Sequence, residues 1–347
     1  MSSILLALGV FWIAVALGAV VTTVVIPVLR KLGAHKRADR KQTLYGEEAV
    51  EFKKIREKEE QGVERRPVPR MGGLTLVPTI AVLGISLAVF LDSRLLLSVI
   101  LTIVAVVLIM LYDDLTDIGI INRTPLRIRD RLLLLGGVTM VAGFSIAQIV
   151  PHYVTFLPFA PFENVFVGTV GIALLFALWC IFWQVSSVID GIDGLAGSIF
   201  LILFSGTSLL SIMQGNESTL LLSALGLGVV IPWLFANYAP AKAYLTETGI
   251  TTLITLFATI TFLLGVGTAS GAGLWVGAVF GTVLIATWAS NVLQLVYRRK
   301  TGKKLFRIAP LHHHFEAIGM PGSAVVLRYT LVTFLCVVLG LSLMHIL

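Results

Sequence analysis

Charged residues are scarce in this sequence, since Asp, Glu, Lys and Arg make up 13% of its 347 residues. A soluble domain of ordinary composition carries about 25%, so most of this chain has too few charges to form a surface in water. Hydrophobic residues make up 57%. This composition indicates an integral membrane protein. We therefore attribute the high pI of about 9.5 to orientation in a membrane and expect no nucleic-acid partner.

Cysteine is rarer still, with only Cys180 and Cys336 in the chain. Both lie inside apolar runs, and neither has the spacing of metal ligands or of a redox motif. We expect both to be small core residues.

Long apolar runs fill most of the sequence, and strand-like alternation is missing, which argues against a membrane β-barrel. Runs of this length are typical of membrane-spanning helices. The first is too long for the core of a signal peptide, so we interpret it as a retained helix. We expect an all-α, polytopic membrane protein with a single transmembrane domain over 1–347. Its ten helices are expected at about 4–29, 71–91, 95–112, 132–150, 165–184, 195–213, 218–236, 250–268, 273–297 and 324–346.

Basic residues are distributed unevenly between the two sets of loops. If the N-terminus lies outside, 25 of the 26 Lys and Arg fall on the inner side and only Arg94 falls on the outer side. Because cytoplasmic loops carry the excess of Lys and Arg, this split predicts both termini outside. The predicted cytoplasmic loops are about 30–70, 113–131, 185–194, 237–249 and 298–323.

Carboxylates gather in two of these loops. Asp113, Asp114 and Asp117 lie at the inner end of the third run, where a helical turn would present them together. Asp190 and Asp193 lie in an Asp-Gly-Ile-Asp-Gly motif and would share a face if helical. Like charges at a membrane boundary are costly unless a cation neutralises them, and Mg²⁺ commonly binds carboxylates together with substrate phosphates. A solvated helix end is the plainer alternative for the first cluster.

Histidines gather in a third cytoplasmic loop, at His312, His313 and His314. With the nearby Arg307 they form a patch of donors suited to phosphate oxygens. Zinc is a weaker alternative, because adjacent histidines cannot easily all face one tetrahedral centre. A solvated polar loop is another alternative. The loop that contains Tyr244 and Glu247 is uninformative alone, but it lies on the same face.

Carboxylates and phosphate-binding cations therefore converge on one side of the membrane. Positioning and charge neutralisation dominate phosphoryl-type transfer, so this combination points to that chemistry. A site at the bilayer edge suggests one water-soluble substrate and one lipid substrate.

Several motifs resemble those of the polyprenyl-phosphate N-acetylhexosamine-1-phosphate transferases, and the resemblance covers most of the chain. The triple-histidine block is the most specific motif and is similar to the muramoyl branch of that family. The matching segments are Pro69-Arg-Met-Gly-Gly73, Asp113-Asp114, Asp190-Gly-Ile-Asp-Gly-Leu-Ala196, Asn237 with Pro240-Ala-Lys242, and the block from Thr301 to Glu316.

The resemblance implies an Mg²⁺-dependent enzyme of the bacterial cytoplasmic membrane, with its active site on the cytoplasmic face. In this reaction undecaprenyl phosphate attacks the β-phosphate of UDP-MurNAc-pentapeptide, UMP leaves and lipid I forms, as a step of peptidoglycan synthesis. It also implies contact with membrane lipids and a homodimer.

The resemblance further assigns roles to individual residues. Asp113 and Asp114 would position or deprotonate the lipid phosphate, and Asp190, Asp193 and Glu247 would lie at the metal. His312, His313 and His314 would contact the sugar-phosphate portion. The substrate-binding residues would be Arg65, Gly191, Ile192, Asn237, Tyr244 and Arg307, with Asn237 and Tyr244 at the uridine.

Three positions depart from the muramoyl pattern. Glu247 stands where that branch has a metal-binding Asp, and Ser187 stands where it has an Asn. Asp117 stands where it has a Lys and is similar to the N-acetylglucosamine branch. Two alternatives therefore stay open, namely the same transfer with another sugar such as UDP-GlcNAc, and a catalytically impaired homologue that binds lipid phosphate or nucleotide.

Overall fold

The computed structural model describes residues 2–34, 68–157, 165–266 and 273–346. Helices dominate it, as the long apolar runs predict. They are α1 (Ser2–Lys31), α3 (Val77–Phe90), α4 (Arg94–Asp117), α5 (Ile128–Ala147), α6 (Gly168–Gln184), α7 (Leu195–Gln214), α8 (Glu217–Asn237), α9 (Thr246–Gly265), α10 (Leu274–Phe280), α11 (Thr282–Thr301), α12 (Leu311–Ala317) and α13 (Gly322–Ile346). Two short 3₁₀ helices, η2 (Gly72–Thr75) and η3 (Ser187–Ile189), and a strand pair, β1 (Tyr153–Val154) with β2 (Val165–Phe166), complete the described chain.

Nine helical segments of the described chain are long and apolar enough to cross a membrane, and the bent pair of α10 and α11 brings the number to ten. The chain is therefore a polytopic all-α membrane protein, which confirms the predicted fold class. Side-chain caps fix two of the helix starts, because Ser93 accepts from the backbone of Leu96 and Asn216 accepts from that of Thr219.

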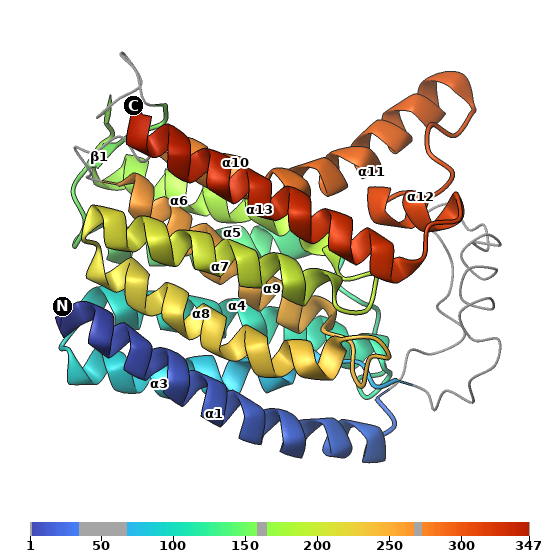
Figure 1. Cartoon of the computed structure of the whole chain (residues 1–347), viewed down its shortest axis with the longest axis horizontal. Helices are drawn as coiled ribbons and strands as arrows, with labels where there is room; N and C mark the ends of the chain where they lie inside the picture. Colours follow the sequence, from blue (N-terminus) through green and yellow to red (C-terminus); the bar gives the residue numbers. More distant parts are fainter. Residues whose placement is uncertain (1, 35–67, 158–164, 267–272, 347) are drawn as a thin grey trace.

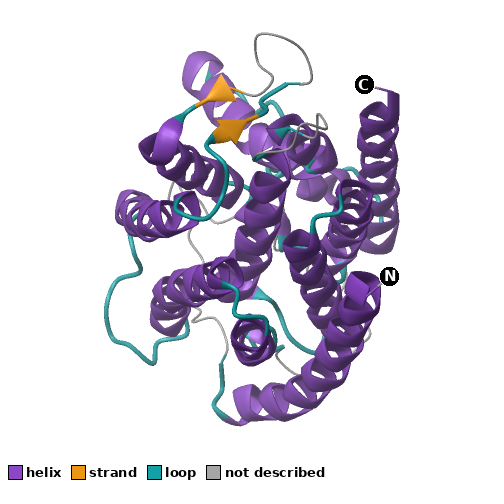
Figure 2. Ribbon diagram, turned by 90° about the vertical axis from the view of Figure 1, so that its left-hand side faces the viewer, coloured by secondary structure: helices purple, strands orange, loops and turns teal. Residues whose placement is uncertain are grey.

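The long helices run side by side, with the N-terminus at the left in Figure 1. We call the opposite end the basic end. There α1, α4, α6 and α8 finish, and α5, α7, α9 and α13 begin. All described Lys and Arg residues except Arg94 lie at this end. Figure 2 views the molecule from the other end, where the β1–β2 pair lies.

Helix α9 forms the centre of the bundle. Every residue of its spanning window is buried, and it packs against α4, α6, α7, α8, α10 and η2. Glycine lets η2 approach it closely, since a Cβ on Gly73 would lie 2.2 Å from the backbone nitrogen of Gly249. This contact brings the start of α9 against the segment that follows Pro69.

The run predicted as a single span at 273–297 is broken in the structure. Helices α10 and α11 meet at an angle of 74°, and Gly281 lies at the break. A Cβ at Gly281 would lie 2.1 Å from the ring of Trp183, so this close approach requires glycine. The bend turns α11 away from the bundle and carries the segment with α12 over the basic end (Figure 1).

The two cysteines are free, and they differ in exposure. Cys180 is buried, as predicted, but Cys336 is only half-buried on α13. The expectation of a core position is therefore right for Cys180 and wrong for Cys336, because a run that faces lipid is as apolar as one that faces the core.

Candidate functional site

Asp113 and Asp114 are buried in the last turns of α4 and have different partners. Asp113 accepts from the backbone N–H of Leu126 at 2.8 Å and pairs with Arg131. Asp114 accepts at Oδ2 from the hydroxyls of Thr246 and Thr248, at 2.7 and 2.5 Å, and from the backbone N–H of Thr248 at 2.9 Å. Burial of two neighbouring carboxylates is tolerated because each has its own donors.

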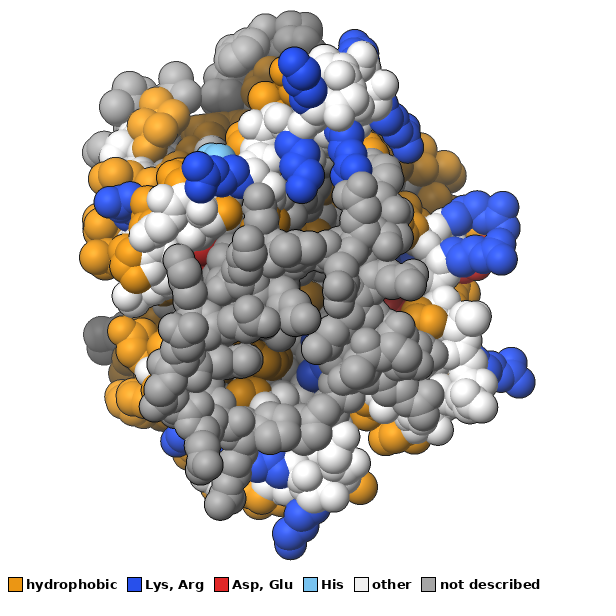
Figure 3. Space-filling view, turned by 90° about the vertical axis from the view of Figure 1, so that its right-hand side faces the viewer, with side chains coloured by type: hydrophobic (Ala, Val, Ile, Leu, Met, Phe, Trp, Pro, Cys, Tyr) orange, Lys and Arg blue, Asp and Glu red, His pale blue; other side chains and the backbone are white. Residues whose placement is uncertain are grey.

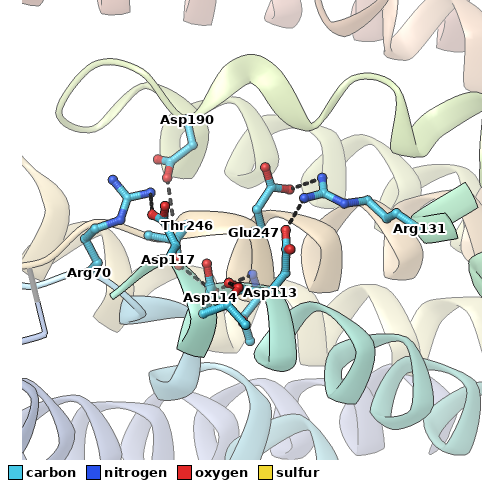
Figure 4. A network of polar contacts seen from close by, with 10 residues as sticks. Arg70, Asp113, Asp114, Asp117, Arg131, Asp190, Thr246 and Glu247 are labelled. Atoms are coloured by element: carbon cyan, nitrogen blue, oxygen red, sulfur yellow. Dashed lines mark hydrogen bonds and ion pairs between the residues drawn. The ribbon is translucent and has the colours of Figure 1, made fainter. Parts of the chain in front are cut away.

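Thr246 joins two of the predicted acidic residues. Its hydroxyl donates to Asp114, and its backbone N–H donates to Asp190 at 2.9 Å. It holds these contacts with a φ of 58°, a left-handed conformation that is rare for a β-branched residue. Strain of this kind clusters at functional sites. The contact also connects α4, the 190–194 loop and the start of α9 (Figure 4).

Arg131 lies between Asp113 and Glu247. One of its terminal nitrogens pairs with Asp113, and the other lies 3.1 Å from Glu247 Oε2. Its side chain is 24% exposed, so the pair is partly shielded from water and weakly screened. The guanidinium thus holds the first carboxylate of α4 beside the residue that the sequence assigns to the metal (Figure 4).

A cavity of about 240 Å³ opens beside these residues. Burial raises the pKa of Asp190 to about 6, and the charges of Glu247 and Asp114 add to this rise. Arg70 and the backbone N–H of Thr246 oppose it. The cavity is lined by Arg70, Ser187, Val188, Asp190, Gly191, Ile192, Tyr244, Thr246, Glu247, Ile250 and His313.

Asp190 and Asp193 do not share a helix face, which corrects the sequence expectation. Helix α7 begins only after them, with Gly194 at a φ of 80° as its N-cap, and each carboxylate binds a different backbone group. Asp190 accepts from Thr246, whereas Asp193 accepts from the N–H of Ala241 at 2.9 Å. Asp193 is not among the residues that line the cavity.

Asn237 and Tyr244 hold loops together. The buried Asn237 accepts from the N–H of Gly194 and donates to the carbonyl of Ala243, both at 3.0 Å. Tyr244 donates its backbone N–H to Pro69 and accepts from Gly72. Tyr244 lines the cavity and Asn237 does not. The predicted uridine contact is therefore sterically available to Tyr244, whereas Asn237 has structural bonds that the sequence did not indicate.

The three adjacent histidines have three different environments. The His313 ring lines the cavity and contacts Glu316 through Nδ1 at 2.6 Å. His312 is fully buried, and burial lowers its pKa well below the usual 6.5. A neutral ring offers one donor and no charge. His314 accepts from the backbone of Arg307, and the Arg307 guanidinium donates to the carbonyl of Ala317. Of the three histidines, His312 and His314 do not line the cavity, and Arg307 does not line it either.

Both buried histidines pack against Gly191. A Cβ at this position would lie 2.5 Å from His312 Nε2 and 2.7 Å from His313 Nε2. The bend at Gly281 places α12 close enough for this contact. The third predicted cluster thus meets the second at the cavity wall.

Arg70, Arg131, Thr246, Thr248 and Glu316 belong to the site, yet the sequence did not single them out. Arg131 was counted only as evidence of orientation, Arg70 and Glu316 appear only inside matching segments with no role of their own, and the threonines carry no recognisable signal. The predicted Arg65 lies outside the described residues. Figure 3 shows Lys and Arg side chains around the rim of the basic end.

The donor chemistry fits Mg²⁺. Asp113, Asp114, Asp117, Asp190 and Glu247 meet two arginines in Figure 4, so carboxylates outnumber guanidinium groups. No group of three His, Cys, Asp or Glu side chains stands at metal-binding distances within the described ranges. Mg²⁺ usually takes only one or two carboxylates and completes its shell with water and substrate phosphates.

Comparisons with known proteins agree with this geometry. The model of glycosyl transferase family 4 matches residues 96–265. A protein of Staphylococcus aureus (strain MSSA476) named phospho-N-acetylmuramoyl-pentapeptide-transferase is 27% identical over 296 residues, which cover 83% of this chain and 88% of that protein. The proteins of the same name in strains MW2 and JH9 match to the same extent. The matched family region contains the aspartates of the site and Glu247, but it ends before the histidine block and Glu316.

Proposed function

Because the chain belongs to glycosyl transferase family 4, we propose that it transfers phospho-N-acetylmuramoyl-pentapeptide from its UDP donor to undecaprenyl phosphate. The products are lipid I and UMP, and the step belongs to peptidoglycan synthesis. One observation carries the proposal: Thr246 joins Asp114 and Asp190 at a cavity that Arg70, Glu247 and His313 also line. The names of the relatives support the choice of the transferred group.

The reaction exchanges one phosphorus–oxygen bond for another. An unesterified oxygen of the lipid phosphate attacks the β-phosphorus of the donor. The bond from that phosphorus to the oxygen bridging the α-phosphate breaks, and UMP leaves with the bridging oxygen. A phosphate monoester has a second pKa of about 6, so the acceptor is largely ionised at neutral pH and needs little help from a base.

Asp114 is the residue proposed to orient the acceptor; it does not itself line the cavity and is joined to the cavity wall through Thr246. Its Oδ2 is fixed by three donors, so the carboxylate has one orientation when the lipid phosphate arrives. It also takes up the proton of any acceptor that enters protonated. Asp113 is held by Arg131 and Leu126 and keeps Arg131, and through it Glu247, in place.

Asp190 and Glu247 are the proposed protein ligands of Mg²⁺. Both line the cavity, and the charge of Glu247 contributes to the raised pKa of Asp190. Bound there, the ion would neutralise charge on the diphosphate of the donor. Asp193, which the sequence also assigned to the metal, stays a prediction because its observed partner is Ala241.

The donor is proposed to enter between Tyr244 and the histidine block. Tyr244 offers an aromatic face for the uracil, and His313, oriented by Glu316, offers a donor to the sugar-phosphate. His312 supports His313 by packing and contributes no charge. Gly191 packs directly on both rings.

The same transfer with UDP-GlcNAc is the alternative, and Asp117 is the residue that favours it. The proposed location is the bacterial cytoplasmic membrane, with the basic end in the cytoplasm. A homodimer stays a prediction.

The test uses the purified full chain in detergent. Undecaprenyl phosphate, Mg²⁺ and either UDP-MurNAc-pentapeptide or UDP-GlcNAc are added, and UMP release is followed. We expect release with the muramoyl donor that depends on the lipid phosphate. Release with UDP-GlcNAc alone would replace the proposed donor, and no release with either would overturn the proposed activity.

A further inference from the structure

Arg70 is fixed at the mouth of the cavity by its backbone. Its N–H donates to the carbonyl of Ala34 at 2.7 Å, and two residues later Gly72 donates to Tyr244 at the same distance. The intervening Met71 has a φ of 64° and a buried side chain. The main chain around Arg70 is therefore held on both sides, and the side chain is directed into the cavity wall beside Asp190 and Tyr244.

The guanidinium of Arg70 is only partly used. Its one ion pair among the described residues joins Nη2 to Asp117 Oδ2 at 3.4 Å, and its Nε is buried with no hydrogen-bond partner in the described chain. Arginine carries five N–H donors in a planar fork. A half-buried guanidinium with an unfilled donor is poorly satisfied unless a ligand supplies acceptors.

The surroundings of Arg70 define what that ligand is. Asp117 holds the guanidinium from the side of α4, and the charge of Arg70 reaches Asp190 across the cavity. The fork of an arginine matches the spacing of phosphate oxygens. Among the described residues that line the cavity, Arg70 is the only Lys or Arg.

We propose that Arg70, oriented by Asp117, binds a phosphate oxygen of the substrates in this cavity. The assignment rests on the proposed function for the identity of those substrates, which are a nucleoside diphosphate sugar and a lipid phosphate. The shared chemistry is the phosphate group. Asp117 acts through Arg70 and is a positioning residue.

Binding to the purified full chain tests this assignment without requiring turnover. UDP, uridine and farnesyl phosphate are titrated separately into wild type, Arg70→Met and Arg70→Lys, with Mg²⁺ present. If Arg70 contacts the nucleotide phosphates, Arg70→Met lowers the affinity for UDP about ten- to hundredfold and leaves the affinity for uridine unchanged. If it contacts the lipid phosphate, the same loss occurs with farnesyl phosphate. Arg70→Lys keeps the positive charge and is expected to lose less affinity than Arg70→Met.

Arg129→Met is the matched control. It removes one positive charge from the basic end, but its side chain is 81% exposed and pairs only with the neighbouring Asp130 among the described residues. We expect it to bind both phosphate probes like wild type. Asp117→Asn is expected to weaken binding of the same probe as Arg70→Met does, but by a smaller factor. In the double variant, Asp117→Asn should cause no further loss of affinity beyond that of Arg70→Met.

Two results would overturn the assignment. The first is unchanged affinity of Arg70→Met for both phosphate probes. The second is an equal loss for uridine and UDP, which would indicate a structural role. Failure of the proposed function is seen separately, because an enzyme that releases no UMP can still bind UDP through Arg70.

Discussion

Thr248 donates two hydrogen bonds to one oxygen of Asp114, from its backbone N–H at 2.9 Å and from its hydroxyl at 2.5 Å. Because Thr248 lies in the first turn of α9 and Asp114 in the last turn of α4, this contact fixes the ends of two central helices together. A carboxylate held so by charge-assisted bonds has little rotational freedom. Its orientation is therefore set before substrate arrives.

Removal of the Thr248 hydroxyl is expected to slow turnover. Thr248→Val keeps the volume and the backbone bond but loses one hydrogen bond to a charged group, so we expect kcat to fall roughly ten- to hundredfold. Thr248→Ser keeps the hydroxyl and is expected to stay within a few-fold of wild type. Thr252→Val is the control, because that hydroxyl bonds only the carbonyl of Thr248 in the described chain. Equal effects of Thr248→Val and Thr252→Val would contradict a role in orienting Asp114.

Glu247 is expected to be essential as a carboxylate and tolerant of a shorter side chain. Glu247→Ala removes the partner of Arg131 and a proposed Mg²⁺ ligand, and UMP release should be abolished. Glu247→Asp should retain or raise activity, since an Asp is what the muramoyl branch has at this position. Full activity of Glu247→Ala, measured over a range of Mg²⁺ concentrations, would remove Glu247 from the metal site.

Gly191→Ala is expected to disturb the histidine block. The added methyl group would lie 2.5 Å from His312 Nε2 and 2.7 Å from His313 Nε2, so both rings must move. We expect activity to fall at least tenfold while the protein stays folded. Gly137→Ala is the control, because nothing lies within 4 Å of a Cβ there. If Gly191→Ala matched Gly137→Ala in kcat, the position of the two rings would not matter for the reaction.

Asp190 gives the fold a pH dependence in the absence of Mg²⁺. Its pKa is about 6 in the folded chain and near 3.9 in an unfolded one. A carboxyl whose pKa is higher in the folded chain opposes folding when it is ionised. Its contribution to the free energy of unfolding therefore falls as pH rises from about 4 to 6. In EDTA, Asp190→Asn should therefore raise Tm relative to wild type at pH 7.5 and do so less at pH 5. A constant difference between these two pH values would contradict the raised pKa.

Most of the fold follows from the sequence, because apolar runs of spanning length leave helices as the way to satisfy the backbone in a membrane. The bend at Gly281 does not. It depends on contact with Trp183, about a hundred residues away in the chain, and the run around Gly281 is apolar on both sides of the break. Without that bend the histidine block would not reach Gly191.

The acidic and histidine clusters of the site could be predicted because carboxylates and adjacent histidines are rare in an apolar chain. Their partners could not. Thr246 and Thr248 look like ordinary threonines at the start of a helix, and Arg70 lies in a matching segment that gives it no role of its own. Asp117 was expected in the first carboxylate cluster and as a departure from the muramoyl pattern, and its pairing with Arg70 could not be predicted.

The central claim is that this chain makes a lipid-linked diphosphate sugar, and the lipid product tests it most directly. Wild type and Asp114→Asn are incubated with undecaprenyl phosphate, UDP-MurNAc-pentapeptide and Mg²⁺, and the lipid extract is analysed by mass spectrometry. We predict the mass of lipid I with wild type and its near absence with Asp114→Asn. An extract from folded wild type that contains only unreacted undecaprenyl phosphate, or equal product from both proteins, would contradict the account.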